Sequence, residues 1–332
     1  MSGGYVHRLD PVLADLGGVY LWWYGAGFAL GFLQLHRVLL RSHVRLGLTR
    51  RSAWALSMLL TVAVLGGGRG VQMAFDEWPF YRAHPAFVPA FWLGGMATHG
   101  LLLGAAVATA AGAVIWRVPF LALADTLAIP GAFLMGVGRL GNFIDGQIVG
   151  AVTDGWWGVQ FPYAEGFRHP VVLYDGVKNL VLVAYLLHVR RTTTTPGAVA
   201  ARFVFWYAAP RVVIDLWRDY PTHRLALGTG QTLNLAMSAL GLVLLWRSRQ
   251  RRLGRLAPAA VPVPLAASAD RAPSPGQRLA FALLLAACLL IPSNWTQDVP
   301  RRYGGRHPGL VHSRMYPALD WTPPPATPLS PR

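Results

Sequence analysis

Several polar side chains interrupt stretches of this sequence that are otherwise apolar. His99 opens one such stretch, Arg139 and Asn142 lie at the end of another, and Arg211 and Asp215 lie near the end of a third. A charged side chain in lipid costs of order 3 kcal/mol, so each position is a candidate functional site. Guanidinium groups bind phosphate through paired N–H donors, and an imidazole can take up a proton. Together these residue types suggest an anionic site of phosphate size.

Each of these residues also has a structural interpretation. His99 could hydrogen-bond at a helix interface, Arg139 could extend to lipid headgroups, and Arg211 could pair with Asp215 inside a polar bundle. Arg211, Asp215 and Arg218 are separated by four and three residues, which predicts one helical face for all three. Taken singly, the structural interpretations are favoured. The collection of these residues at one predicted membrane depth favours a site.

The composition indicates a membrane protein. Of 332 residues, 54% are hydrophobic and only 13% are charged, and the mean hydropathy is +0.38. A soluble domain carries about a quarter charged residues. The single cysteine, Cys288, excludes an intramolecular disulfide, a cysteine-based zinc cluster and a CxxC redox site.

Apolar runs predict an all-α integral membrane protein with about seven transmembrane helices, because a spanning helix needs about 20 mostly apolar residues. The runs are 18–35, 53–67, 91–116, 119–137, 171–187, 203–216 and 232–246. A weaker eighth run, 279–292, predicts a short apolar helix.

The arginines predict the orientation, since loops rich in Lys and Arg stay in the cytoplasm. One set of alternate loops is rich in arginine: 37, 41, 45, 50, 51, 117, 190, 191, 202, 247, 249, 251, 252 and 255. The opposite set is sparse: 8, 69, 82, 139, 168, 218 and 224. This pattern places the N-terminus outside and explains most of the net charge of +16 without a nucleic-acid partner.

Composition also divides the chain into three parts. Residues 1–250 form the predicted polytopic membrane core. Residues 251–278 are rich in Arg, Ala, Pro and Ser, which is typical of a flexible linker, here cytoplasmic. Residues 279–332 comprise the short apolar helix and a tail that would be exported.

The polar positions lie in six blocks that resemble, in order, the motifs of bacterial phosphatidylglycerol:prolipoprotein diacylglyceryl transferases. The run GRLGNFIDGQ at 138–147, with Gly150 after it, is similar to the family signature G-R-x-G-N-F-x-N-x-E. Two blocks, GGMATHG at 94–100 and HPVVLYD at 169–175, resemble the stretch with the family's essential histidine and the motif H-P-x-x-L-Y-E. The others are WYG at 23–25, the series Tyr207, Arg211, Asp215 and Arg218, and Gly230 with Gln231. The resemblance covers roughly residues 21–241.

The resemblance implies an enzyme that transfers diacylglyceryl from phosphatidylglycerol to the lipobox cysteine of a preprolipoprotein. The products would be a thioether and glycerol-1-phosphate, and no metal or nucleotide cofactor is required. The enzyme would lie in the bacterial cytoplasmic (inner) membrane among its lipids.

The resemblance also implies roles for single residues. His99 would be the base that activates the acceptor thiol, with Tyr207 or Tyr24 as hydrogen-bond partner. Arg139 and Arg211 would hold the leaving phosphate. The positions expected to bind or orient the phospholipid are Tyr24, Asn142, Gly150, Tyr207, Asp215 and Arg218.

Five positions depart from the family pattern and predict a divergent member. Asp145 replaces Asn, Gln147 replaces Glu, and Ala151 stands where an Arg often follows. Asp175 and Asp215 replace Glu, so they keep the charge and lose a methylene group. The net charge of the signature loop is thus predicted to stay the same, but the negative charge moves from position 147 to position 145. This change puts the choice of lipid donor in question.

Cys288 ends the sequence LAAC at 285–288, which matches a lipobox. With Arg278 before the apolar run, the segment has the layout of a lipoprotein signal, so Cys288 is a possible lipidation target. The favoured alternative is a short apolar helix in which the cysteine packs as a small hydrophobe.

Two other function classes fit the sequence less well. One is a non-catalytic membrane protein that binds anionic phospholipid through the same arginines and recruits a partner through its C-terminal tail. The other, a small-molecule transporter, lacks the expected paired broken helices and inverted repeat in the sequence.

Overall fold

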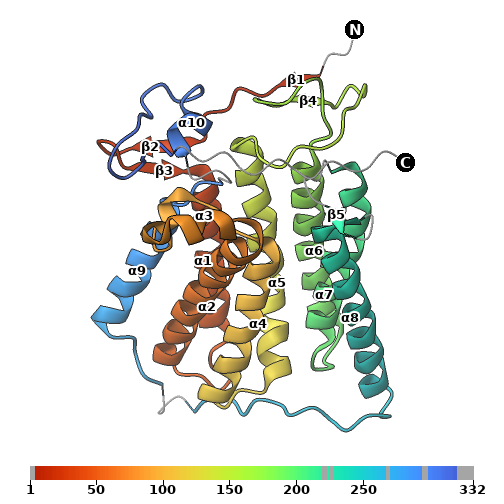
Figure 1. Ribbon diagram of the computed structural model, residues 1–332. Helices are drawn as coiled ribbons and strands as arrows, with labels where there is room; N and C mark the ends of the chain where they lie inside the picture. The colour runs from red at the N-terminus through yellow and green to blue at the C-terminus, as the bar shows by residue number, and fades with distance from the viewer. Residues whose placement is uncertain (1–3, 219–222, 225–226, 267–269, 294–297, 320–332) are drawn as a thin grey trace.

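The computed structural model describes residues 4–218, 223–224, 227–266, 270–293 and 298–319. Within this part of the chain, seven helices of 17 to 25 residues form the body of the molecule (Figure 1). They are α1 (Trp23–Ser42), α2 (Arg50–Val71), α4 (Thr98–Ile115), α5 (Phe120–Ile144), α6 (Val171–Thr192), α7 (Ala198–Ile214) and α8 (Thr229–Arg252). The mostly helical architecture confirms the predicted fold class.

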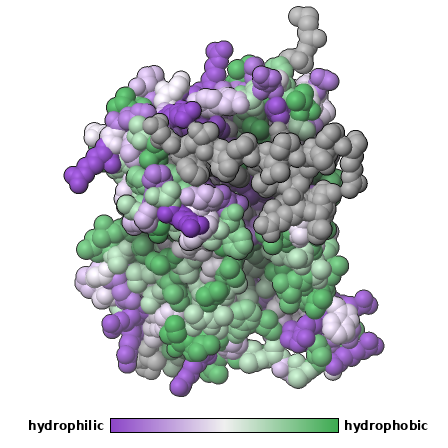
Figure 2. Space-filling view, in the orientation of Figure 1, coloured by the Kyte–Doolittle hydropathy of each residue, from purple (hydrophilic) through white to green (hydrophobic). Residues whose placement is uncertain are grey.

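Four of these helices are long and apolar enough to cross a membrane: α4, α5, α6, and α2 extended by the π-helical turn η1 (Gln72–Asp76). The described helices fit an all-α membrane protein, but the predicted count of seven spans is not confirmed. Apolar side chains such as Val107, Val114 and Leu242 are exposed on the outer surface of the helices. Figure 2 shows apolar residues across the middle of the molecule and hydrophilic residues at both ends.

The core lies where α1, α5, α6 and α7 meet. α1 packs against α5, α5 packs against α6 and α7, and two further pairs form between α2 and α4 and between α7 and α8. The buried side chains of this core include Phe28, Met135, Leu186 and Ala208. These contacts fix the relative positions of the helix ends on which the polar residues lie.

Short elements cover one end of the bundle, the upper end in Figure 1. β2 (Val12–Asp15) and β3 (Tyr20–Trp22) form an antiparallel hairpin, and β1 (Tyr5–Val6) pairs in parallel with β4 (Val159–Gln160). β5 (His223–Arg224) pairs with β6 (Leu227–Gly228). The helical turns are α3 (Trp78–Ala83), η2 (Pro85–Phe87), η3 (Phe91–Leu93), η4 (Asp215–Trp217) and α10 (Val299–Tyr303).

Two predicted spans begin later than the apolar runs indicated. The first helix begins at Trp23 because residues 12–22 belong to the hairpin. The third begins at Thr98 because the chain turns through η3 and then through Gly94 and Gly95, whose φ angles are +86° and +82°. Glycine adopts positive φ angles without steric cost, so the two glycines allow this turn before the helix. The residues of the turn are apolar as well, and the apolar run therefore starts before the helix does.

The segment after α8 returns along the opposite end of the bundle and leads into α9 (Pro275–Leu289). Described residues 253–266 and 270–274 form no helix or strand, but Asp270 accepts a hydrogen bond from Arg50 Nε at 2.7 Å. α9 begins with a capping box between Ser274 and Gln277 and packs against α1. The predicted linker residues 267–269 and tail residues 320–332 lie outside the described residues.

Candidate active site

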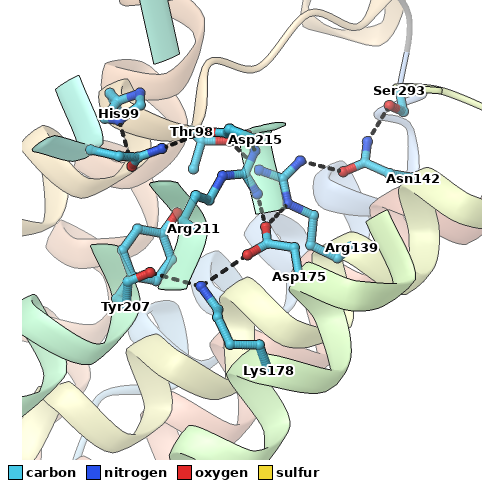
Figure 3. Close-up of polar contacts among 11 residues, drawn as sticks. Thr98, His99, Arg139, Asn142, Asp175, Lys178, Tyr207, Arg211, Asp215 and Ser293 are labelled. Carbon is cyan, nitrogen blue, oxygen red and sulfur yellow. Dashed lines mark hydrogen bonds and ion pairs between the residues drawn. The ribbon is translucent and has the colours of Figure 1, made fainter. Parts of the chain in front are cut away.

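Five helices bring polar side chains together at the upper end of the bundle (Figure 3). The N-terminal parts of α4, α6 and α8 and the C-terminal parts of α5 and α7 meet there, although they are far apart in sequence. The arginine-rich ends of α6 and α8 lie at the opposite end of the molecule.

The Asp175 carboxylate lies at the centre of this group and is fully buried. Its Oδ2 accepts hydrogen bonds from Arg139 Nε at 2.6 Å and from Arg211 Nη1. Its Oδ1 lies 2.9 Å from Lys178 Nζ, which also donates to the backbone carbonyl of Tyr207 at 2.7 Å. A buried carboxylate with three basic partners holds two guanidinium groups in fixed positions.

Arg139 makes two further contacts that fix the plane of its guanidinium. Nη1 donates to Asn142 Oδ1 at 3.2 Å, and Nη2 donates to Thr98 Oγ1 at 2.9 Å. With the bond to Asp175, these described contacts use three of the five N–H donors of the group. Arg139 can therefore remain held by the protein while it binds a phosphate oxygen.

His99 belongs to the same network through Asn234. Asn234 Nδ2 donates to Asp215 Oδ2 at 2.9 Å, which directs its Oδ1 toward His99 Nε2, 3.2 Å away. Because an amide oxygen only accepts, Nε2 carries the proton and Nδ1 carries the lone pair. This tautomer suits a general base that takes up a proton at Nδ1.

The contacts close into a ring. Asp215 Oδ1 lies 3.6 Å from Arg211 Nη2, and Thr98 precedes His99 in the chain. The order around the ring is Thr98, Arg139, Asp175, Arg211, Asp215, Asn234 and His99. Among the described residues, no three His, Cys, Asp or Glu side chains lie together as a metal ion would require.

The structure thus places His99, Arg139, Asn142, Arg211 and Asp215 together, as their positions in the sequence predicted. Four members of the site were missed. They are Thr98, Asp175, Lys178 and Asn234. Thr98 and Asp175 lie in two of the blocks that resemble the family motifs, and Asp175 and Lys178 are three residues apart in an apolar segment, but none of the four was predicted as a site residue.

The prediction of one helical face for Arg211, Asp215 and Arg218 is wrong at its last member. α7 ends at Ile214, Asp215 begins a 3-10 turn, and Arg218 is extended. Arg218 forms an isolated bridge with Gly150, so these two predicted positions lie together beside the ring. The change from 3.6 to about three residues per turn alters the direction of the chain after Asp215.

The two predicted tyrosines are buried in different surroundings. Tyr207 lies on α7, with Lys178 Nζ 4.5 Å from its ring centroid. Tyr24 lies on α1, where its backbone passes so close to Gly141 that a Cβ there would come within 2.6 Å of the Tyr24 Cα. Tyr207 or Tyr24 was predicted to hydrogen-bond His99. In the structure, the partner of His99 Nε2 is the side-chain oxygen of Asn234.

Asp145 follows α5 directly and changes the charge of the signature loop. Its carboxyl group is fully buried, and burial raises its pKa to about 8, although the Ser293 N–H and the Arg306 guanidinium oppose this shift. Asp145 is therefore mostly protonated at neutral pH. Burial thus favours the neutral form of this carboxyl group, which opposes the predicted retention of net charge by the loop.

Replacing Asp145 by Asn is expected to remove a pH dependence of stability. The unfolded carboxyl ionises near pH 4, so between about pH 4 and the folded pKa the unfolded chain releases a proton that the folded protein retains. The Asp145 carboxyl group should then contribute a fall in the free energy of unfolding of up to about 1.4 kcal/mol per unit of rising pH. Burial lowers the pKa of the neighbouring His7, which makes stability rise with pH near pH 6.5, so the effect of Asp145 is the difference in slope between the variant and the unaltered protein.

Thermal melts of the purified protein between pH 6.5 and 8 check this expectation. The melting temperature of the Asp145→Asn variant should have a less negative slope against pH than that of the unaltered protein, while the exposed control Asp154→Asn should keep the slope of the unaltered protein. Equal slopes in all three proteins would contradict a titrating Asp145.

Cys288 is completely buried in α9. Its backbone carbonyl approaches α1 so closely that a Cβ on Gly25 would lie 2.2 Å from the oxygen. A diacylglyceryl group on this thiol would force α9 away from α1, so the packing favours the interpretation of Cys288 as a small hydrophobe.

We expect Cys288 to be unmodified in the folded protein, since its thiol faces the core. Mass spectrometry of the peptide that contains residue 288, from an active membrane preparation, checks this directly. A diacylglyceryl adduct on that peptide would support the lipobox interpretation instead.

Comparison with known proteins identifies the family of this chain. Residues 11–247 match the sequence model of the family described as prolipoprotein diacylglyceryl transferase. A phosphatidylglycerol–prolipoprotein diacylglyceryl transferase of Geobacter sulfurreducens is 35% identical over 256 residues, which cover 74% of this chain and 98% of the relative. Similar enzymes of Nitrosomonas europaea and Tolumonas auensis are each 34% identical, over 72% and 73% of this chain and 90% and 97% of their own lengths. The chain belongs to the prolipoprotein diacylglyceryl transferase family.

Proposed function

We propose that this protein transfers the diacylglyceryl group of phosphatidylglycerol to the lipobox cysteine thiol of preprolipoproteins. The observation that carries this function is the buried ring, in which a histidine and two arginines lie within one network in a chain of this family. The family match supplies the substrates, and the ring supplies groups suited to the chemistry.

The ring is suited to a phosphate group. Three basic side chains, Arg139, Arg211 and Lys178, face the two carboxylates Asp175 and Asp215. Guanidinium donors match phosphate oxygens in geometry, and Arg139 keeps two N–H donors that its described contacts do not use. Arg139 and Arg211 are the residues that we propose hold the phosphate of phosphatidylglycerol.

The chemical step needs a thiolate and a stabilised leaving group. A free cysteine has a pKa near 8.5, so a base must take the thiol proton at neutral pH. We propose that His99 Nδ1 takes this proton while the sulfur attacks the terminal glyceryl carbon of the diacylglyceryl group. The carbon–oxygen bond to phosphate breaks, its electron pair leaves with glycerol-1-phosphate, and the arginines stabilise the new charge.

Tyr24, Asn142, Gly150, Tyr207, Asp215 and Arg218 are the remaining residues proposed to bind or orient the phospholipid. Asn142 and Asp215 act through the two arginines that they contact. Gly150 and Arg218 lie beside the ring, where the glycerol headgroup would extend.

We propose that all seven long helices span the bacterial cytoplasmic membrane with the N-terminus outside. The arginine-rich helix ends opposite the site support this orientation, because such ends stay in the cytoplasm. Residues 1–250 would then form the membrane core, 251–278 a cytoplasmic linker, and 279–332 a helix and tail that return to the outer side.

The test of this function is an assay of the purified protein with phosphatidylglycerol and a lipobox peptide. We expect the peptide to gain one diacylglyceryl group, measured by mass spectrometry, and the lipid to release glycerol phosphate. A protein that binds phosphatidylglycerol vesicles but leaves the peptide unmodified would be the non-catalytic phospholipid-binding protein instead.

A further inference from the structure

The C-terminal segment lies beyond the family match at residues 11–247, yet it packs into the covered end of the bundle. Val299, Tyr303 and Tyr316 are fully buried in a cluster with Tyr20 and Trp22 of the hairpin. The ring of Tyr303 lies 5.2 Å from that of Trp22, directly before the WYG motif. The described part of the segment is therefore an integral part of this end of the fold.

Ser293, just after α9, contacts the signature loop twice. Its Oγ accepts a hydrogen bond from Asn142 Nδ2 at 2.5 Å, and its backbone N–H donates to Asp145 Oδ2 at 2.9 Å. Ser293 and Asn142 are both buried. Ser293, in the C-terminal segment, therefore hydrogen-bonds to Asn142, which itself accepts a hydrogen bond from Arg139.

Tyr303 and Arg306 hold the same loop from the other side. The Tyr303 hydroxyl accepts a hydrogen bond from Gln147 Nε2 at 3.2 Å and donates one to the backbone carbonyl of Ser293. Arg306 donates to the carbonyl oxygens of Ile144 at 3.1 Å and Asp145 at 2.7 Å, at the end of α5. A cation at this position stabilises the helix that carries Arg139.

We propose that Ser293 and Tyr303 are positioning residues of the active site, which set the orientation of Asn142 and through it the guanidinium of Arg139. The proposal rests on the proposed function and extends it to a segment that the family match does not include. The segment contacts Asp145 and Gln147, two positions of the loop that depart from the family pattern, as well as Asn142 and Ile144.

The orientation of the Asn142 amide is the physical link. The Ser293 oxygen fixes the NH₂ group of Asn142 on its own side, so Oδ1 faces Arg139 Nη1. Without that oxygen, the amide can turn and place an N–H donor toward a guanidinium that can only donate. Arg139 would then lose an acceptor at the position where it is expected to meet the lipid phosphate.

The test uses the full chain with Ser293→Ala and Tyr303→Phe, and Ser313→Ala as the matched control. Ser313 is an exposed serine of the same segment, bonded to Tyr316. Steady-state assays with phosphatidylglycerol and a lipobox peptide measure KM for each substrate separately. We expect Ser293→Ala to raise KM for phosphatidylglycerol roughly tenfold, the effect of one lost hydrogen bond at a buried group, and Tyr303→Phe to raise it less.

The KM for the peptide should stay unchanged in all three variants. A purely structural role would reduce the amount of folded enzyme, which lowers the apparent kcat but leaves KM the same. Unchanged KM for phosphatidylglycerol in both variants would therefore overturn the proposal.

An inactive unaltered protein would refute the proposed function but would still allow this inference to be tested. Native mass spectrometry of the same proteins with phosphatidylglycerol would then give the lipid affinity. Weaker binding by Ser293→Ala than by Ser313→Ala would support the positioning role, and equal binding would overturn it.

Discussion

The Arg139→Ala variant is expected to lose transferase activity by roughly a hundredfold to a thousandfold, the effect of removing one preorganised donor to a developing charge. The guanidinium contacts Asp175, Asn142 and Thr98 at once, so its removal also leaves the buried Asp175 without one of its partners. The measurement is the initial rate of glycerol phosphate release from phosphatidylglycerol. Arg139→Lys should recover only part of this rate, because an ammonium keeps the charge but loses the planar, paired donors.

Folding must be measured separately, because breaking a buried ion pair costs about 3–5 kcal/mol of stability. Melting temperatures of both variants show whether the protein is intact at the assay temperature. The matched control is Arg82→Ala, an exposed arginine of α3 at the same end of the molecule. Full activity in a folded Arg139→Ala protein would contradict the assignment.

The His99→Ala variant is expected to lose activity by roughly a hundredfold to ten-thousandfold near neutral pH, which is the usual contribution of a general base. The physical reason is that the acceptor thiol must be deprotonated, and Asn234 fixes the tautomer in which Nδ1 can take the proton. The loss should shrink as the pH rises past about 8.5, where the peptide thiol ionises without help.

Rates measured from pH 6.5 to 10 with the same lipobox peptide check this expectation. The control is His188→Ala, an exposed histidine near the far end of α6, which should follow the profile of the unaltered protein. A deficit of His99→Ala that is the same at every pH would show that His99 has a role other than accepting the thiol proton.

Local sequence patterns predicted where the long helices lie more accurately than the residues at which they begin. Apolar runs located each long helix, because burial and lipid exposure both select apolar residues over about 20 positions. They placed the starts of the first and third helices too early, since hairpin residues 12–22 and Phe91–Leu93 are apolar as well. A preference for an apolar environment does not distinguish a helix from a covered turn.

The members of the site that were predicted are those with a large local signal. Arg139 and Arg211 stand out because guanidinium groups are rare in apolar segments. Asp175 was noted only as a departure from the family pattern, although it joins both arginines. Its role depends on the packing of α6 between α5 and α7, which no short stretch of sequence records.

Asn234 and Ser293 were missed for the same reason. Asn234 lies 135 residues from His99, and Ser293 lies 151 residues from Asn142. Asn234 lies within α8 and Ser293 lies just after α9, and for small polar residues at such positions a hydrogen bond to the local backbone or solvent exposure is the ordinary expectation. Only the assembled bundle shows that they orient two other side chains.

The ring around Asp175 is proposed to hold the headgroup of phosphatidylglycerol. The most direct test of this proposal is photo-crosslinking of the purified protein with phosphatidylglycerol that carries a photoreactive group on its glycerol headgroup, followed by mass spectrometry. We expect labelled peptides from the end of α5, the start of α6 and the end of α7, and less label in Arg139→Ala. Label confined to the opposite end of the bundle, for example at the polar cavity lined by Arg45 and Arg190, would contradict it.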